Sequence, residues 1–524
     1  MAELAVDRRL AQRAKVAAVL RTRTGAVGFC LCRGGSARPR EFGRSPDDSI
    51  RAGDGAAARD LARLRFCLLR NAERASADSA FSDRARNIFG FSEARYRCGT
   101  PAHRLRSGSR ALWCYTRRLV DCVGVPTNLT RGMKQIAIVG GGPAGALCGE
   151  RLATAGFEVT IFDERLAWEK PCGGGLTHKA IETYPFLLDT PHPKKIIRTA
   201  ELISSHGHRA RFEMDNPIVI YARKVLNGLL LDRAVAAGCT AIRSRVTEID
   251  TKCARVKLSV GKEEAEVDFA VLAAGARNQL LPETTALGAR DLEMTLGYFV
   301  PTEEDILKVK FLKQFEGYLW SFPRADHISV GICAKLGQSS SQELRRHLED
   351  FISKENIPME GAQLYSHVLP SPQAQTIRGR RIAGRNWALA GDAAACVDPI
   401  TGEGLYYALR SGDLLAQAIA DGQPQAYPER LRAAFSADLE FAANIARKVF
   451  RGTFLGGAIT TRMVQLVNYS PTFRDLMRDI FSGSQEYRGL KRRLWGQLGI
   501  TMAEFVHSFL DPRLVREVAA REPS

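Results

Sequence analysis

The sequence predicts an α/β fold that carries an inserted antiparallel β-sheet and a helical C-terminal region. Residues 134–164 have the pattern of a strand, a glycine-rich turn, a helix and a second strand, which is typical of a parallel sheet covered by helices. Residues 294–335 contain four strand-like segments joined by short turns, which is more antiparallel sheet than a doubly wound domain holds. Residues 427–520 are mainly helical in pattern. We therefore expect two packed domains followed by helices.

The composition is that of a globular protein whose basic charge lies mostly in its first part. The chain has 524 residues, enough for several domains, and a formal net charge of +18. Most of that excess lies in residues 1–132, so the rest is close to neutral and nucleic acid is not an expected partner. The 12 Cys show no repeating spacing, which favours free thiols of a cytoplasmic protein and no metal site. No apolar stretch is long enough to span a membrane.

Residues 1–132 form an Arg-rich extension whose interpretation stays open. The region is rich in Ala, Gly and Ser, and no long segment in it is convincingly periodic. One interpretation is that Met133, directly before the first strand, is the true start and that the extension is not part of the natural protein. The alternatives are a disordered basic extension, a targeting segment and a small independent domain. Glu3 and Asp7 argue against a transit peptide.

The first glycine-rich turn predicts a bound dinucleotide. Gly140, Gly142 and Gly145 give the spacing G-x-G-x-x-G directly after a short apolar strand. The first glycine allows a tight turn, the second lets a pyrophosphate approach the backbone, and the third lets the helix pack on the strand. The helix from about 143 to 155 directs its N-terminal N–H groups at that phosphate. Asp163 ends the next strand, where it can accept hydrogen bonds from a ribose, so we expect a Rossmann-like domain that binds an adenine dinucleotide.

The segment 168–176, WEKPCGGGL, predicts a loop that lies close to a flat ligand. Three consecutive glycines after Cys172 do not fit a helix interior, and they let the backbone approach a ligand closely. A plain flexible loop is the alternative. The elements expected next are a strand over 218–224 that leads to Arg223, a helix over 226–237, a strand of the parallel sheet over 239–246 with Val246 near its end, and a hairpin formed by 255–260 and 264–272.

A second glycine-rich stretch, residues 386–410, predicts another clamp for the same ligand. A short strand runs into Gly391 and Asp392, and a helix begins near Gly404 after a loop with Pro399 and Gly402. A carboxylate at a strand end and a glycine loop at a helix start can hold a polyol and an anion. Two such clamps, far apart in the chain, fit a long ligand that is held at both ends.

The two glycine-rich stretches together carry a family resemblance. GGGPAG at 140–145 and GDAAACVDPITGEG at 391–404 resemble the flavoprotein group that contains the aromatic-ring hydroxylases and the geranylgeranyl reductases. Three further motifs resemble those of the reductases, namely KPCGGGL at 170–176, GYLWSFP at 317–323 and PITGEGLYYALRSGD at 399–413. The resemblance covers about residues 133–422 and says nothing about the Arg-rich extension.

The resemblance implies FAD as the cofactor and gives each matching residue a place on it. By this resemblance the pyrophosphate would contact Gly140, Gly142, Ala144 and Gly145, the adenosine ribose Asp163, and the isoalloxazine side Cys172, Gly173 and Gly175. Arg223 would reach the cofactor and Val246 would lie beside the adenine. The second clamp would consist of Gly391, Asp392, Pro399, Gly402, Gly404 and Leu405, with Asp392 on the ribityl and pyrophosphate portion. The substrate would face Tyr318, Trp320 and Phe322.

The resemblance further implies an FAD-dependent oxidoreductase that reduces C=C bonds of a geranylgeranyl or other isoprenoid chain by hydride transfer from reduced flavin. Cys172 is then the candidate catalytic residue. The electron donor stays open between NADPH and reduced ferredoxin, and an electron-donor protein and a peripheral membrane contact are compatible partners. The main alternative is an FAD-dependent monooxygenase of an apolar or aromatic substrate. Many hydroxylases carry Gly-Ala-Asp-Gly where this chain has LAAGA at 272–276, and the missing Asp argues against that alternative.

These elements give the expected division of the chain. The FAD-binding domain is expected at 133–290 and 375–425, and the substrate-binding β domain at 291–374. The helical C-terminal region is expected at 426–524.

Overall fold

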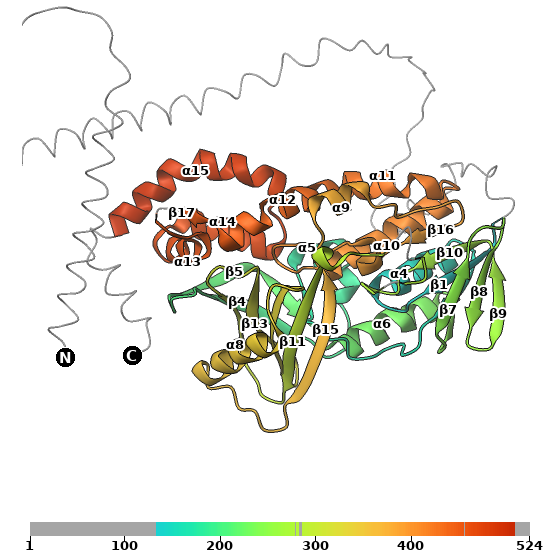
Figure 1. Ribbon diagram of the computed structural model, residues 1–524, viewed down its shortest axis with the longest axis horizontal. Helices are drawn as coiled ribbons and strands as arrows, with labels where there is room; N and C mark the ends of the chain where they lie inside the picture. Colours follow the sequence, from blue (N-terminus) through green and yellow to red (C-terminus); the bar gives the residue numbers. More distant parts are fainter. Residues whose placement is uncertain (1–132, 278, 282–285, 455, 509–524) are drawn as a thin grey trace, which may run out of the picture. The chain divides into compact units, whose positions relative to one another are not determined.

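The computed structural model describes residues 133–277, 279–281, 286–454 and 456–508 (Figure 1). The Arg-rich extension 1–132 lies outside the described residues, so its interpretation stays a prediction. The described part contains a five-stranded sheet, an eight-stranded sheet, two small sheets and a group of C-terminal helices. The α/β fold class expected from the sequence is confirmed.

The five-stranded sheet is parallel; its strands over 269–272 and 387–389 and most of that over 135–139 are apolar and buried on both faces, whereas its edge strand over 240–242 is largely exposed. Its strands are β1 (Gln135–Val139), β2 (Glu158–Phe162), β6 (Thr240–Ile242), β10 (Phe269–Leu272) and β16 (Trp387–Leu389), in the order β16-β10-β1-β2-β6. The helices that pack with it are α4 (Pro143–Thr154), α6 (Arg223–Ala236) and α10 (Leu405–Ala420). Helix α4 contacts both α6 and α10, so the two glycine-rich turns, which start α4 and α10, lie in the same part of the fold.

A three-stranded antiparallel sheet shares the core of the parallel sheet and corrects two expected elements. Its strands are β7 (Val246–Asp250), β8 (Val256–Val260) and β9 (Glu263–Val267). Val246 therefore opens β7, and it does not end a strand of the parallel sheet. The strand expected over 264–272 is two strands, because Asp268 separates β9 from β10. Its carboxylate accepts hydrogen bonds from the backbone N–H groups of Lys134 and Gln135 at 2.8 and 2.9 Å.

The eight-stranded sheet extends beyond the range expected for the substrate domain. Its strands are β3 (Gly175–Leu176), β4 (Lys195–Ile203), β5 (Arg209–Ile220), β11 (Leu292–Val300), β12 (Ile306–Phe311), β13 (Gly317–Pro323), β14 (Ile328–Lys335) and β15 (Gln363–Pro370), in the order β15-β11-β14-β13-β12-β4-β5-β3. Neighbours are antiparallel except β12 and β4, which pair in parallel. The boundary 291–374 is too narrow, because that parallel pairing joins β3–β5 to the sheet across more than 100 residues of chain.

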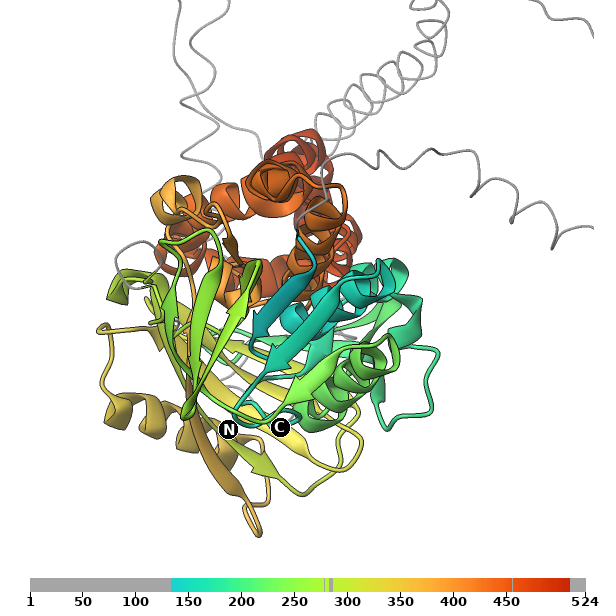
Figure 2. The same cartoon turned by 90° about the vertical axis from the view of Figure 1, so that its right-hand side faces the viewer.

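The two faces of this sheet are covered by different helices. Helix α8 (Ser341–Lys354) packs Leu344, Leu348 and Phe351 on one face. On the other face, Leu307 and Phe212 share a core with the C-terminal helices, seen in red and orange above the sheet in Figure 1. Those helices are α12 (Ala437–Arg451), α13 (Ile459–Tyr469), α14 (Pro471–Ser482) and α15 (Tyr487–Ser508). Figure 2 shows the same helices grouped on one side of both sheets.

The remaining elements are short. They are α5 (His178–Thr183), α9 (Ala374–Gly379), α11 (Tyr427–Leu431) and the hairpin of β17 (Thr453–Phe454) and β18 (Gly457–Ala458). Across the described ranges, no helix combines the length and the apolar character that crossing a bilayer requires. The C-terminal region was expected to be helical. It consists of helices from α11 to α15, interrupted by the hairpin of β17 and β18.

Two glycines inside helices should respond oppositely to an added methyl group. In Gly412→Ala, the new Cβ on α10 would lie 2.2 Å from the carbonyl oxygen of Ala144 on α4, so we expect a loss of about 1–3 kcal/mol in unfolding free energy. In the control Gly228→Ala on α6, the nearest atom is 3.8 Å away, so we expect a gain of about 0.5–1 kcal/mol. Thermal melting of both variants measures the difference. Equal melting temperatures would contradict the close approach of α4 and α10.

Candidate functional site

The first glycine-rich turn forms a cradle that is open on one side. Gly140 has φ +108°, and a Cβ there would lie 2.3 Å from the carbonyl oxygen of Ala273. A Cβ on Gly145 would lie 2.0 Å from the carbonyl oxygen of Gly140. The helix packs so closely on the turn that it leaves no room for a side chain at Gly145. A Cβ on Gly142 would meet nothing within 4 Å. Helix α4 has neither a capping side chain nor an acidic residue in its first turn, so its N–H groups remain available to an anion.

Asp163 lies at the end of β2, as expected, and it also holds its own loop. One carboxylate oxygen accepts a hydrogen bond from the N–H of Gly141 at 2.8 Å. The other accepts from the N–H groups of Arg165 and Leu166 at 2.8 and 2.7 Å. The carboxylate is thereby fixed beside the glycine cradle, and its remaining lone pairs face the same cavity as Gly142.

The second glycine-rich turn contains a buried ion pair that the sequence did not predict. Asp392, directly after β16, pairs with the ammonium group of Lys170 at 2.7 Å, and both side chains are largely buried. Burial alone would raise the pKa of Asp392, but the positive charge of Lys170 outweighs it and holds that pKa below its usual value. Lys170 stands in the quoted motif KPCGGGL, so the residue itself was visible, but its partner 222 positions away was not.

Arg223 supplies a buried cation with unused hydrogen-bonding capacity. It is the first residue of α6 and does not end a strand, because β5 stops at Ile220. Its backbone N–H donates to the carboxylate of Glu169 at 2.9 Å, and its guanidinium donates to the side-chain oxygen of Asn227 at 3.3 Å. The Nε atom is buried and meets no acceptor among the described residues. Such an atom fits a polar or anionic ligand group, because an unpaired buried donor is costly.

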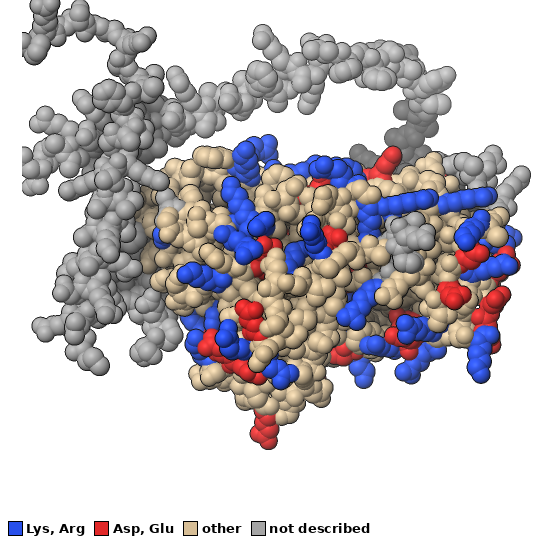
Figure 3. Space-filling model, viewed as in Figure 1, with Lys and Arg blue, Asp and Glu red and all other residues tan. Residues whose placement is uncertain are grey.

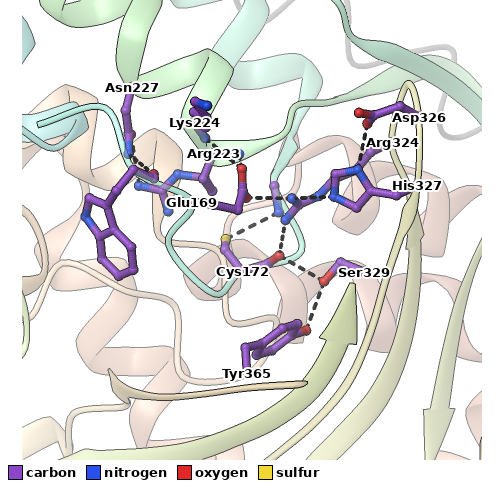
Figure 4. Close-up of polar contacts among 12 residues, drawn as sticks. Glu169, Cys172, Arg223, Lys224, Asn227, Arg324, Asp326, His327, Ser329 and Tyr365 are labelled. Carbon is purple, nitrogen blue, oxygen red and sulfur yellow. Dashed lines mark hydrogen bonds and ion pairs between the residues drawn. The ribbon is translucent and has the colours of Figure 1, made fainter. Parts of the chain in front are cut away.

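Arg324 connects the loop 168–176 to the eight-stranded sheet (Figure 4). Its side chain is fully buried just after β13 and donates to the carboxylate of Glu169 at 2.6 Å and to the backbone oxygen of Cys172 at 2.5 Å. Ser329 on β14 also donates to the Cys172 oxygen, at 3.0 Å. Glu169 in turn accepts from the first two N–H groups of α6, which has no capping side chain of its own. This network fixes the loop from two directions.

A cavity of about 420 Å³ brings nearly all of the predicted site residues together. The residues that line it are Gly140, Gly142, Ala144, Asp163, Cys172, Gly173, Gly175, Arg223, Tyr318, Trp320, Phe322, Gly391, Asp392, Gly402, Gly404 and Leu405. Gly145, Val246 and Pro399 do not line it. Gly145 is packed against the turn and Val246 lies in the three-stranded sheet, and the place expected for Val246 beside the adenine stays a prediction.

The sheet wall of the cavity changes from polar to apolar across its strands. One row of paired residues runs from His367 on β15 through Thr295 and Cys333 to Tyr318 and Phe311 on β12. Because side chains alternate along a strand, Glu293 faces the same way as Thr295, and Trp320 and Phe322 the same way as Tyr318. All of these residues line the cavity.

The C-terminal helices close the apolar side of this cavity. Its lining includes Phe450 of α12, Met463 of α13, and Met477 and Phe481 of α14. The hydroxyl of Tyr318 donates to the backbone oxygen of Thr401 at 2.5 Å, so the aromatic strand also touches the second glycine-rich loop. The apolar stretch near 454–467 contributes Val464 and Val467 to the core and Met463 to the cavity.

Three titratable side chains of the cavity were missed from the sequence. Burial raises the pKa of Glu293, and it raises that of Glu403 to about 7, although Thr177 donates a hydrogen bond to Glu403 at 2.6 Å. Burial and the nearby charge of Lys170 lower the pKa of His367 to about 4. At neutral pH the imidazole of His367 is therefore neutral, and burial favours the protonated form of both carboxyl groups. The one local signal in the sequence for these three residues was Glu293, a glutamate within the alternating apolar pattern of β11.

Comparisons with known proteins agree with this geometry. A family model for pyridine nucleotide-disulphide oxidoreductases matches residues 134–311. The geranylgeranyl diphosphate reductase of Synechocystis is 28% identical over 314 residues, which are 54% of this chain and 75% of that protein. The digeranylgeranylglycerophospholipid reductase of Methanoculleus marisnigri is 29% identical over 311 residues, and the match again covers 54% of this chain and 75% of that protein.

These matches support an FAD-dependent oxidoreductase domain in this chain. The fold is that of a geranylgeranyl bacteriochlorophyll reductase-like protein from Thermoplasma acidophilum, with a TM-score of 0.58, 21% identity, and coverage of 70% of this chain and 100% of the other. Three features of the cavity fit FAD: the open side of Gly142, the uncapped start of α4, and the unpartnered Nε of Arg223. Within the described ranges, no cluster of three His, Cys, Asp or Glu side chains could hold a metal ion, and every cysteine is a free thiol.

Removing the buried cation should loosen the cofactor site. Arg324→Met leaves the carboxylate of Glu169 and the oxygen of Cys172 without that partner, so we expect unfolding free energy to fall by about 3–5 kcal/mol and FAD to be retained less well. Thermal melting and flavin absorbance after gel filtration measure both effects. The control Arg345→Met, at an exposed position of α8, should change neither. A stable, flavin-loaded Arg324→Met protein would show that the network is dispensable.

Glu403 should make stability depend on pH in a defined direction. Its folded-state pKa of about 7 lies above the ordinary value of 4.5, so the folded protein keeps a proton that the unfolded chain has already released. The free energy of unfolding should therefore decrease as pH rises from about 4.5 to about 7 and then level off, relative to Glu403→Gln. Melting temperatures of the two proteins across this range provide the measurement. A difference that stays constant with pH would contradict the raised pKa.

Proposed function

We propose that this FAD-dependent oxidoreductase reduces C=C bonds of a geranylgeranyl or other isoprenoid chain. The observation that carries the proposal is the single cavity that joins both glycine-rich turns to an aromatic strand and to apolar residues of α12, α13 and α14. A long apolar chain needs such a wall, whereas a small polar substrate does not. The similarity to two reductases of geranylgeranyl compounds supports the same substrate class.

The cofactor is assigned to the polar side of the cavity. The cradle at Gly140–Gly142 and the first turn of α4 would hold the pyrophosphate, and Asp163 the adenosine ribose. Asp392 and the loop with Gly402 and Gly404 would hold the ribityl chain and the ring system. Arg223 would donate its free Nε to the cofactor. Bound there in its reduced form, FAD supplies a hydride to the substrate.

The protein side chains then have three tasks. Tyr318, Trp320 and Phe322 exclude water and present aromatic faces, which can stabilise positive charge that develops on an alkene carbon. Glu293 lines the cavity and burial raises its pKa, so it is the candidate to hold the proton that the second alkene carbon requires. The thiol of Cys172 would lie beside the ring system; its sulfur accepts a hydrogen bond from the N–H of Gly174 at 3.3 Å.

Anaerobic reoxidation of the flavin tests the proposal directly. The purified protein is reduced without oxygen, geranylgeranyl diphosphate is added, and flavin absorbance is followed. We expect the oxidised spectrum to return and a product with fewer double bonds to form, because the electrons enter the alkene. If the flavin stays reduced until oxygen is admitted, and a hydroxylated product then forms, the FAD-dependent monooxygenase is the correct function.

A matched pair of variants belongs to this experiment. Cys172→Ser should slow anaerobic reoxidation while FAD absorbance per protein stays unchanged, since the backbone contacts of Cys172 with Arg324 and Ser329 remain. Cys253→Ser, at an exposed cysteine outside the cavity, is the control and should match the wild type. Unchanged turnover in Cys172→Ser would remove this thiol from the mechanism.

A further inference from the structure

Helix α15 has one face that is anchored in the protein. Leu490 and Phe505 pack on the core shared by the eight-stranded sheet and the C-terminal helices. Glu504 accepts hydrogen bonds from the hydroxyl groups of Ser470 and Thr472 at 2.5 and 2.8 Å. Arg493 pairs with Asp479 at 2.5 Å. These contacts fix the rotation of the helix about its axis, and so they decide which side chains point outward.

The opposite face of α15 exposes large apolar side chains. Trp495 is 67% exposed, Leu498 37% and Val506 41%. At 100° per residue these three positions fall on the same outer side of the helix, away from Leu490 and Glu504. Leu494 and Ile500 of α15 are exposed as well, at 38% and 55%, on other sides of the helix, and the remaining exposed apolar side chains of the described residues are scattered singly, which is ordinary for a surface. A row of them that includes a Trp on one helix face indicates a binding surface.

Positive charges adjoin this apolar row. Arg488, Lys491 and Arg492 are exposed in the first two turns of α15, on the same side as Trp495. In Figure 3, blue side chains gather on the upper edge near the start of α15, and tan surface lies toward its end. Cations beside a Trp and aliphatic side chains match the boundary of a bilayer, where headgroups carry negative charge and acyl chains begin.

The start of α15 is also part of the cavity wall. Gly483, Gln485 and Tyr487 line the cavity next to Ile480 and Phe481 of α14. The hydroxyl of Tyr487 donates to the carboxylate of Asp398 at 2.7 Å, and Asp398 belongs to the second glycine-rich loop. A lipid chain that left a bilayer beside α15 would therefore meet the apolar side of the cavity first.

We propose that the outer face of α15 docks this protein on a bilayer that contains anionic lipids, with Trp495 and Leu498 in the interface and Arg488, Lys491 and Arg492 at the headgroups. The part of this inference that concerns substrate entry rests on the proposed function. The docking surface itself does not, because it follows from the exposed side chains of α15 alone.

Quenching of Trp fluorescence tests the surface. The full chain, loaded with FAD, is mixed with vesicles of phosphatidylcholine and phosphatidylglycerol whose acyl chains carry bromine, which quenches by contact. The protein carries Trp113→Phe, so that no tryptophan of the Arg-rich extension contributes, and we expect quenching that is lost when Trp495→Phe, which keeps the apolar character of the face, is added. Because the Arg-rich residues 1–132 can bind anionic vesicles on their own, loss of this local signal decides, and bulk adsorption does not.

Vesicle partitioning gives the second measurement. Lys491→Ala together with Arg492→Ala should weaken partitioning onto phosphatidylglycerol vesicles roughly thirtyfold, and Trp495→Ser together with Leu498→Ser should weaken it further. The matched control combines Arg345→Ala with Leu364→Ser, which removes an exposed cation and an exposed leucine elsewhere. FAD absorbance and thermal melting confirm that each variant is folded.

Several outcomes would overturn the proposal. Quenching that persists when Trp495→Phe is added to the Trp113→Phe protein would show that α15 is not the docking face. A change of Trp495→Ser from dimer to monomer in gel filtration, without any effect on vesicles, would assign the face to a second copy of this chain. Anaerobic reoxidation with detergent-dispersed substrate separates the two claims, because the proposed function can hold when docking fails.

Discussion

The buried guanidinium of Arg324 is the interaction on which the rest of the site depends. A charge removed from water is tolerated only where carboxylate and carbonyl groups surround it. Arg324 finds these groups on the loop 168–176, in the carboxylate of Glu169 and the backbone oxygen of Cys172, although it belongs to the eight-stranded sheet. Satisfying this one charge therefore fixes the sheet against the loop. Glu169 extends the constraint to α6, whose first two N–H groups it accepts.

The loop 168–176 acts as the joint between elements that are far apart in the chain. Glu169 reaches α6 and Arg324, Lys170 reaches Asp392 after β16, and Cys172 reaches Arg324 and Ser329 through its backbone. Each contact buries a charge or satisfies a polar group, so none can be lost cheaply. The cavity lies where these contacts converge, which explains why two glycine-rich turns more than 200 residues apart line one space.

The sequence predicted the parts of the site whose signals are local. The glycine spacing at 140–145 and the turn at 391–404 each determine a strand end and a helix start within a few residues, and both were placed correctly. The ion pair of Lys170 with Asp392 and the pairing of β4 with β12 depend on positions more than 100 residues apart, and no local pattern encodes them. Val246 was misplaced because three residues outside any strand separate it from β6, and an apolar run does not reveal such a break.

The alternation of β13 links the substrate wall to the core of the sheet. Tyr318, Trp320 and Phe322 face the cavity, while Leu319 faces the core under α8, so a shift by one residue would exchange the two sets. The aromatic wall therefore cannot be remodelled without disturbing that core. The opposite wall has no such restriction, because α12, α13 and α14 each contribute side chains from separate turns. Differences in cavity shape among proteins with this fold should therefore arise in the helices, which lie outside the range matched by the family model.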